Sequence, residues 1–299
     1  MKQVVDGGHM LYQKYIIPDS SGGYLFVKEH DGSRFTDTEA AGHNQAYLHR
    51  EAETLDSLRK AGYTCIPEQS YMSGETLIMS ANRPEDGWQW SMPSDQAEQS
   101  SYISDVLSAL HGLQELSPAI LPPPTQGASL DEFIGLGWDK LVDPAVRDRV
   151  MEQLRGSRSK LWDNVAPGVG VIESLLSTGL STKQRKQVDE YKQLPRPYTA
   201  HFDARQSNIA WHPEKGVSII DWSWASNSPE GSDATMFIID LFKSGYTPEQ
   251  NLLKKFNPDH ALVLIGYWMA RSIAPVVSGD LTVRFQQIAS AASAATLIA

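Results

Sequence analysis

A group of polar residues around two short apolar segments, near residue 210, constrains this chain more than any other feature. Asp203 and Asn208 follow the pattern D-x-x-x-x-N, and Asp221 stands further along the chain. The apolar segments 209–211 and 217–220 are joined by the turn-forming sequence HPEKG, which predicts a β-hairpin. Because a hairpin brings its two ends together, we expect Asn208 to lie beside Asp221. We expect Asp203 just ahead of them.

This arrangement offers the groups that phosphoryl transfer requires of a protein. The carboxylate of Asp203 can accept a proton from a hydroxyl group, and Asn208 and Asp221 can hold magnesium between nucleotide phosphates. The alternative is an accidental cluster of loop residues. The spacing disfavours that alternative, because Asn208 and Asp221 stand at the two ends of the predicted hairpin and Asp203 stands just ahead of it.

The segment resembles the catalytic segment of the aminoglycoside phosphotransferase and choline kinase family, small-molecule relatives of the protein kinases. That family has approximately H-G-D-x-x-x-x-N-[IV]-L, a hairpin, and then [VI]-I-D-[WF]. His201 and Trp222 match the two ends of the pattern, whereas Phe202 replaces the usual Gly and Ala210 the usual Leu. The resemblance implies that Asp203 is the catalytic carboxylate, that Asn208 and Asp221 are metal ligands, and that His201 is structural.

The resemblance implies an α+β, protein-kinase-like bilobal fold, and the periodicity of the chain is typical of it. We expect residues 1–81 to form an N-terminal β-rich nucleotide-binding lobe. Residues 82–299 are expected to form a C-terminal helical lobe with the catalytic loop and the substrate site. The expected strands are 3–5, 11–17, 24–27, 70–72 and 76–79. The expected helices are 38–61, 99–116, 140–155, 158–177, 181–193, 234–245, 258–274 and 281–298.

The resemblance also implies an ion pair between a lysine that ends the third strand and a glutamate on the following helix. Lys28 closes the strand sequence YLFV, on the same face as Phe26, and so is expected in the interlobe cleft. Glu51 lies in LHREAETL, which is close to the family pattern R-E-x-x-x-L. Glu53 is the alternative partner, because only the phase of the helix separates the two.

Nucleotide contacts are expected from backbone groups. Ser80, Ala81 and Asn82, in the connector after the last strand, are expected to bind adenine. Gly7 and Gly8 stand where a glycine loop would cradle the phosphates through backbone N–H groups, but a complete G-x-G-x-x-G is absent.

Together these features predict a phosphotransferase that moves the γ-phosphate of ATP, or of GTP, to a hydroxyl group of a small molecule with the help of Mg²⁺. A pseudokinase that binds nucleotide without transfer is the alternative. The incomplete glycine loop favours that alternative, and the intact catalytic segment opposes it. A protein kinase is disfavoured, because WSWA follows Asp221 where protein kinases have Phe-Gly and no Ala-Pro-Glu segment follows. Arg205, in the pattern H-x-D-x-R-x-x-N, makes the segment similar to that of a bacterial branch of the family whose substrates are mostly unassigned.

The net charge of −10 and pI near 5.3 disfavour nucleic acid as a partner and fit a cationic acceptor, such as an aminoglycoside-like metabolite. A single cysteine, Cys65, excludes an intrachain disulfide and is expected as a small buried residue. The N-terminus has no apolar signal region, and the longest apolar run, 261–270, is too short to span a bilayer. We therefore expect a cytoplasmic protein without a membrane partner, and the pattern leaves its oligomeric state open.

The acceptor pocket is expected from the helical segment 125–195 and the C-terminal helices. Asp131, Glu132, Trp138 and Trp162 are candidates for a pocket that binds an ammonium group through the tryptophan rings. The favoured alternative is that these tryptophans belong to the core. In the helix sequence LSALHGL, which resembles the family pattern L-x-x-L-H-x-L, His111 is expected to be a core residue.

Overall fold

The computed structural model describes residues 2–5, 12–35, 38–124, 131, 133, 137–161, 163–275 and 282–299. Two compact units make up the chain: Met1–Ala128 with Pro197–Asn227, and Ser129–Arg196 with Ser228–Ala299. The expected lobe boundary after residue 81 falls inside the first unit and stays a prediction. Four residues expected at the nucleotide or acceptor site lie outside the described residues: Gly7, Gly8, Glu132 and Trp162.

An antiparallel sheet of five strands begins the first unit, in the order β1-β2-β3-β5-β4. The strands are β1 (Gln3–Val4), β2 (Tyr12–Pro18), β3 (Tyr24–His30), β4 (Ser70–Ser73) and β5 (Thr76–Ser80). They confirm the strands expected in this part of the chain. Gly74 has φ +60° between β4 and β5, a conformation that favours glycine and makes the tight turn possible.

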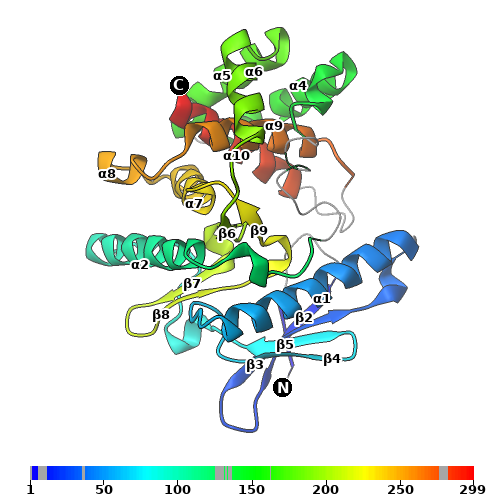
Figure 1. Cartoon of the computed structure of the whole chain (residues 1–299), viewed down its shortest axis with the longest axis vertical. Coiled ribbons are helices and arrows are strands. Elements are labelled where there is room, and N and C mark those ends of the chain that lie inside the picture. The colour runs from blue at the N-terminus through cyan, green and yellow to red at the C-terminus, as the bar shows by residue number, and fades with distance from the viewer. Residues whose placement is uncertain are drawn as a thin grey trace. The chain divides into compact units, whose positions relative to one another are not determined.

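Helix α1 (Thr38–Lys60) packs against β3, β4 and β5 (Figure 1). Leu48, Leu55 and Leu58 recur at helical spacing and are fully buried, so this apolar stripe holds the helix on the sheet. Gly62, with φ +83°, follows the last turn and ends the helix in the left-handed conformation.

The rest of the first unit contains a separate two-stranded hairpin, formed by β7 (Ile209–His212) and β8 (Gly216–Ile219). Helix α2 (Gln96–Gln114), whose N-terminus is capped by the Asp95 side chain, packs against both strands. Strand β6 (Tyr198–Ala200) pairs with β9 (Ser226–Ser228). Short 3₁₀ turns in this unit are η1 (Gly32–Arg34), η2 (Pro84–Asp86), η3 (Pro118–Ile120), η7 (Gln206–Asn208) and η8 (Trp222–Trp224).

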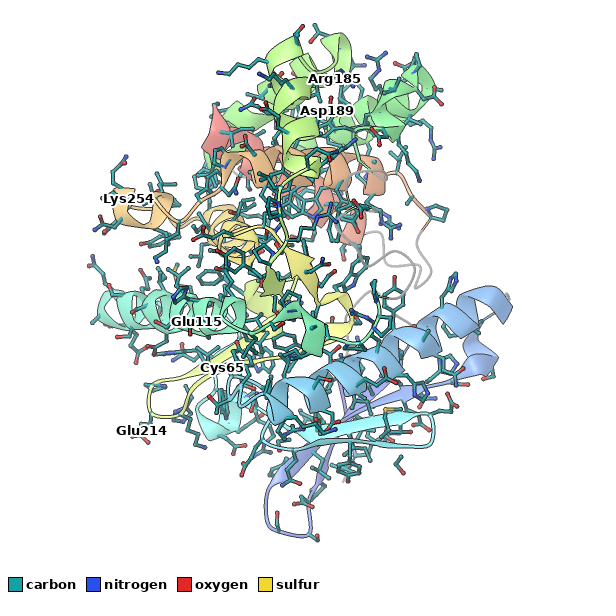
Figure 2. All side chains as sticks on the ribbon, viewed as in Figure 1. Cys65, Glu115, Arg185, Asp189, Glu214 and Lys254 are labelled. Carbon is teal, nitrogen blue, oxygen red and sulfur yellow. The ribbon has the colours of Figure 1, made fainter. Side chains whose placement is uncertain are left out.

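Two expectations about single side chains in the first unit were wrong. The His111 side chain is 72% exposed, because the buried face of α2 carries Leu110 and Leu113 and the next position after Leu110 turns away from it. Cys65, labelled in Figure 2, is only half-buried. Its carbonyl accepts a hydrogen bond from the N–H of Ile219 at 3.0 Å.

The second unit is helical in its described part. Its helices are α4 (Pro144–Ser157), α5 (Ala166–Thr178), α6 (Thr182–Lys192), α7 (Ser232–Lys243), α8 (Gln250–Leu253), α9 (Pro258–Arg271) and α10 (Thr282–Ile298). Its short 3₁₀ turns are η4 (Lys140–Val142), η5 (Arg158–Lys160) and η6 (Asp163–Val165). Helix α10 packs against α5, α7 and α9 through buried alanines that allow close approach. A Cβ at Gly168 of α5 would clash with the carbonyl oxygen of Ala292, so only glycine fits there.

The expected helix 158–177 begins later than the periodicity indicated. Two 3₁₀ turns come first and α5 starts at Ala166, because Pro167 lacks an N–H and suits the first turn of a helix, not its interior. Buried polar groups in this unit include His260, whose Nδ1 lies 2.7 Å from the Tyr191 hydroxyl. Across the described helices of both units, none combines the length and apolarity needed to cross a membrane.

Candidate phosphotransfer site

The β7–β8 hairpin brings two of the predicted site residues together, within the first unit. Ile209 pairs with Ile219, and the N–H of Ile220 donates to the carbonyl of Asn208 at 2.9 Å. Asn208 therefore enters the hairpin where Asp221 leaves it. A local signal, two apolar strands and a turn, is enough to create this proximity.

Asp203 is held by hydrogen bonds to one of its two carboxylate oxygens. Nδ2 of Asn208 donates to Oδ2 of Asp203 at 2.8 Å and to the carbonyl of Asp203 at 2.9 Å. Nη2 of Arg205 lies 3.0 Å from the same Oδ2. Among the described residues no group donates to Oδ1 of Asp203, so this oxygen is available to accept a hydrogen bond from a hydroxyl group.

His201 fixes the backbone of this loop. Its ring is fully buried, with Nδ1 accepting from the N–H of Asp203 at 3.1 Å and Nε2 lying 2.9 Å from the carbonyl of Ile220. These partners require the tautomer with the proton on Nε2. His201 thus connects the residues before β7 to the end of β8.

Two residues of the site adopt backbone conformations that side chains disfavour. Phe202 has φ +61° and Asp221 has φ +68°, both in the left-handed region. This conformation favours glycine at position 202, and here the buried Phe202 ring offsets the backbone cost by packing. Strain of this kind clusters at functional sites, where surrounding contacts impose it.

Lys28 and Glu51 form a buried ion pair. Nζ of Lys28 lies 2.9 and 2.8 Å from the two carboxylate oxygens of Glu51, and the exposed fractions of the two side chains are 5% and 1%. The alternative partner, Glu53, is exposed. Nζ of Lys28 also lies 3.2 Å from Oδ1 of Asp221, whose own N–H donates to Glu51 at 3.1 Å. The ion pair is therefore joined to the residue that follows the β7–β8 hairpin.

Burial and charge act in opposite directions on these groups. Burial lowers the pKa of Lys28, but the carboxylates of Asp221 and Glu51 outweigh it and the net shift is upward. Burial raises the pKa of Asp221, yet Lys28, Arg205 and Lys14 bring it down to about 2. Burial raises the pKa of Glu51, which Lys28 opposes. At neutral pH Lys28 is a cation and Asp221 an anion.

Lys14 and Arg50 belong to this region and were missed as site residues. Lys14 of β2 stands directly opposite Lys28 of β3, and burial, followed by the nearby Lys28, lowers its pKa. The buried guanidinium of Arg50 donates to the carbonyls of Ser223 and Ala225, so it ties α1 to the segment after Asp221. The R-E pair in α1 was a signal for Arg50, whereas Lys14 required the register of the sheet.

The three positions expected to bind adenine are not equivalent. The N–H groups of Ser80 and Ala81 donate to the carbonyls of Gln69 and Tyr24 at 3.0 and 2.9 Å, so both are already used. The carbonyl of Asn82 accepts from the indole of Trp90 at 2.8 Å. Nδ2 of Asn82 is buried without a hydrogen-bond partner among the described residues, which leaves a donor at this point of the connector.

The side-chain oxygens of Asn208 and Asp221 suit a hard cation that phosphate oxygens also bind. Both hydrogens of the Asn208 amide are directed to Asp203, so its Oδ1 points elsewhere, and Asp221 is an ionised carboxylate with 36% of its side chain exposed. Carboxylate and amide oxygens are ligands that Mg²⁺ prefers. In the described part of the chain no group of three or more His, Cys, Asp or Glu side chains could hold a metal ion. A magnesium ion here would need oxygen ligands from a nucleotide.

A comparison with known families decides the relationship that these contacts suggest. Residues 19–254 match the Phosphotransferase enzyme family. The chain belongs to this family. The matched range contains the Lys28–Glu51 pair and the segment from His201 to Trp222. The match confirms the resemblance inferred from that segment. No protein with a curated description matches the sequence.

Three solved structures are similar in fold to this chain. Ethanolamine kinase from Plasmodium vivax has a TM-score of 0.54 at 12% identity, over 97% of this chain and 81% of that chain. Aminoglycoside phosphotransferase APH(4)-Ia has a TM-score of 0.53 at 12% identity, over 100% and 94%. Choline kinase LicA from Streptococcus pneumoniae has a TM-score of 0.50 at 13% identity, over 97% and 94%. At this identity the similarity shows the fold alone, which is the predicted α+β, protein-kinase-like fold.

Proposed function

We propose that this protein transfers the terminal phosphate of ATP, or of GTP, to a hydroxyl group of a small molecule. One observation carries the proposal above the others. Asn208 holds Oδ2 of Asp203 at 2.8 Å and leaves Oδ1 without a donor among the described residues, while Lys28 contacts Asp221 at 3.2 Å. The candidate base, metal ligands and phosphate-binding cation thus lie at the open end of the β7–β8 hairpin, where the N–H of Ile220 donates to the carbonyl of Asn208.

In the proposed reaction, Oδ1 of Asp203 accepts a hydrogen bond from the acceptor hydroxyl and aligns its oxygen with the terminal phosphorus. The bond from this oxygen to phosphorus forms as the bond to the nucleoside diphosphate oxygen breaks, and Asp203 takes the hydroxyl proton. Asn208 and Arg205 keep the carboxylate from rotating by holding Oδ2. Most of the rate gain comes from this positioning and from charge neutralisation.

Asn208 and Asp221 are the residues that would hold magnesium. When bound, the ion supplies positive charge against the phosphate oxygens of the nucleotide. Lys28 adds a second positive charge, and Glu51 fixes its direction through two hydrogen bonds. Lys14, opposite Lys28 in the sheet, adds a third positive charge on the same face.

The unused donor of Asn82 supports a nucleotide base as the neighbour of the connector. Purine rings carry nitrogen and oxygen acceptors that Nδ2 of Asn82 could satisfy. Both adenine and guanine offer such acceptors, so ATP and GTP remain alternative donors. Ser80 and Ala81 are expected to bind adenine through backbone groups, and any contact through their N–H groups would require those groups to leave their present partners.

The acceptor class rests on charge and on the neighbouring folds. A net charge of −10 favours cationic ligands over anionic ones. Similar folds occur in proteins described as choline kinase, ethanolamine kinase and aminoglycoside phosphotransferase. We propose a hydroxylated amine as the acceptor.

The proposal is tested by incubating the purified chain with Mg²⁺ and ATP, or GTP, against a panel of hydroxylated amines, antibiotics and neutral alcohols. Nucleoside diphosphate release is measured, and the phosphorylated product is identified by mass spectrometry. We expect at least one acceptor to give a product with a mass gain of one phosphate, and Asp203→Asn to lose it. Nucleotide binding without product from any acceptor would support the pseudokinase alternative and overturn the proposal.

A further inference from the structure

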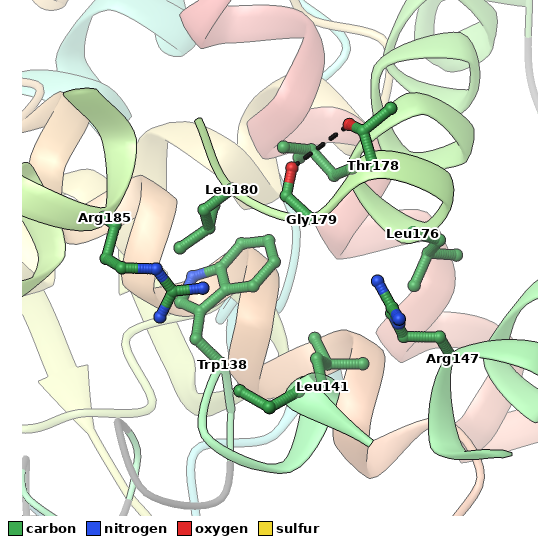
Figure 3. Close-up of a pocket in the computed structure, with 10 residues that line it drawn as sticks. Trp138, Leu141, Arg147, Leu176, Thr178, Gly179, Leu180 and Arg185 are labelled. Carbon is green, nitrogen blue, oxygen red and sulfur yellow. Dashed lines mark hydrogen bonds between the residues drawn. The ribbon is translucent and has the colours of Figure 1, made fainter. Parts of the chain in front are cut away.

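The second unit contains a pocket of about 180 Å³ that no part of the proposed reaction uses (Figure 3). Its walls come from α4, α5, α6 and the segment before α4. Six apolar residues line it: Trp138, Leu141, Val142, Leu175, Leu176 and Leu180. At about 30 Å³ for each water, the volume corresponds to about six water molecules, which is the size of a small organic ligand.

Two arginines complete the lining from opposite sides of the pocket. Arg147 comes from α4 and Arg185 from α6, and in Figure 3 their guanidinium groups flank the indole of Trp138. Among the described residues neither arginine has an ion-pair partner. Asp189, one turn along α6 from Arg185 (Figure 2), is not within ion-pair distance of it either. The lining thus carries two positive charges.

Two carboxylates of α4 line a different cavity. A second cavity, of about 460 Å³, shares Arg147 and Leu176 with the pocket and is also lined by Asp148 and Glu152. Neither of these carboxylates lines the first pocket. Among the described residues that line the apolar pocket, the charged groups are both cations, which distinguishes it from its neighbour.

The wall between the arginines is fixed before any ligand arrives. Trp138 is 6% exposed, and its Nε1 donates to the carbonyl of Leu262 at 2.8 Å. A Cβ at Gly266 would clash with the indole, so the ring is packed directly on the backbone of α9. The hydroxyl of Thr178 is directed to the carbonyls of Ser174 and Gly179. Among the described side chains that line the pocket, the two guanidinium groups are the donors left for a ligand.

We propose that this pocket binds a small organic carboxylate whose apolar body rests against Trp138 and the leucines. The planar guanidinium fork matches a carboxylate in two parallel hydrogen bonds, and apolar walls with few polar groups are typical of small-ligand sites. Two arginines repel an ammonium group, so the pocket does not serve as the cation-binding site that the sequence suggested around Trp138. The proposal stands on the second unit alone and does not depend on the proposed phosphotransfer.

The test uses benzoate and butyrate as anionic probes, with benzamide as the neutral isostere of benzoate and choline as a cation. Binding is measured by isothermal titration calorimetry on the full chain. Arg147→Gln and Arg185→Gln remove the two charges. Arg149→Gln, on the same helix but bonded to the carbonyl of Ile273, and Lys183→Gln, on α6, are matched controls that do not line the pocket.

We expect benzoate to bind with one site per chain and benzamide not to bind. Choline should not displace benzoate, and the two pocket arginine variants should not change any binding of choline elsewhere on the chain. Losing a hydrogen bond to a charged group costs about 1.5–3 kcal/mol, so each pocket variant should weaken benzoate by about 10- to 150-fold, at about 1.4 kcal/mol for each factor of ten. The control variants should stay within about twofold of the parent. The proposal is overturned by equal affinity for benzoate and benzamide, by equal loss in the controls, or by no saturable binding of either carboxylate at about 10 mM, a weak affinity even for a fragment.

Discussion

The Lys28–Glu51 pair makes a prediction about stability that can be worked from its surroundings. Both side chains are almost fully buried, with exposed fractions of 5% and 1%. Removing one partner of a buried ion pair costs about 3–5 kcal/mol, because the other charge is left without compensation. Lys28→Met leaves Glu51 alone in the interior, so we expect the upper end of this range.

Glu51→Gln is expected at the lower end of the same range. Asp221 lies 3.2 Å from Nζ of Lys28 and continues to neutralise it, and glutamine retains the shape of glutamate. The double variant Lys28→Met with Glu51→Gln removes both buried charges. We expect it to lose only about 1–2 kcal/mol, because a buried pair replaced as a whole is close to neutral.

The assay is urea unfolding of the parent, both single variants and the double variant, with Glu53→Gln as the control. Glu53 is exposed, and its variant should stay within about 0.5 kcal/mol of the parent. In thermal unfolding, about 2–4 °C per kcal/mol is expected for a unit of about 160 residues. ATP affinity should behave differently, because the double variant still lacks the lysine and should bind little worse than Lys28→Met.

One result would refute this reasoning. If the losses of unfolding free energy in the two single variants simply add in the double variant, the two charges do not compensate each other in the folded protein. The burial and the distances between Lys28 and Glu51 would then have no energetic counterpart. The hairpin argument for Asp203 and Asn208 rests on separate contacts and would be unaffected.

Three further predictions concern single residues. Asp203→Asn should lower turnover by roughly 100- to 10,000-fold with nucleotide affinity nearly unchanged, as for loss of a positioned base. Steady-state kinetics and nucleotide titration check this expectation, and unchanged turnover would exclude Asp203 as the base. Asp221→Ala should abolish the magnesium dependence of ATP binding, and Asn208→Ala should weaken this dependence less because a neutral amide is replaced. Calorimetry of ATP binding with and without Mg²⁺ distinguishes the two variants. An unaltered magnesium effect in Asp221→Ala contradicts the assignment of Asp221 as a metal ligand. Burial lowers the pKa of His260 from 6.5 to about 3. Below pH 6.5 protons therefore bind the unfolded chain first, and the free energy of unfolding falls by about 1.4 kcal/mol for each pH unit that the pH is lowered. In unfolding experiments His260→Asn should lack this slope between about pH 6.5 and 4.5, and an equal slope in both proteins would argue against the buried, neutral His260.

The sequence by itself determined the parts of the site that depend on local chain geometry. The strands of the hairpin and their turn are encoded within consecutive residues, so the approach of Asn208 to Asp221 could be predicted without tertiary information. The spacing of Asp203 and Asn208 in one loop was equally informative. Apolar periodicity also located most helices, since each buries one face whatever lies against it.

Only the tertiary structure decided between neighbouring residues whose side chains point in different directions. Glu51 and Glu53 lie on the same helix, and packing of α1 on the sheet buries one and exposes the other. Lys14 joins Lys28 because the register of β2 and β3 places them opposite each other. His111 points to solvent because its neighbours face the core.

The pocket of the second unit shows the same limit. Arg147 and Arg185 are ordinary charged residues on separate helices, and no spacing in the chain connects them. They flank one cavity because α4, α5 and α6 pack around Trp138, whose indole is fixed by the backbone of α9. Local sequence specifies which segments become helices, but the groups that meet between helices depend on contacts between residues distant in the chain.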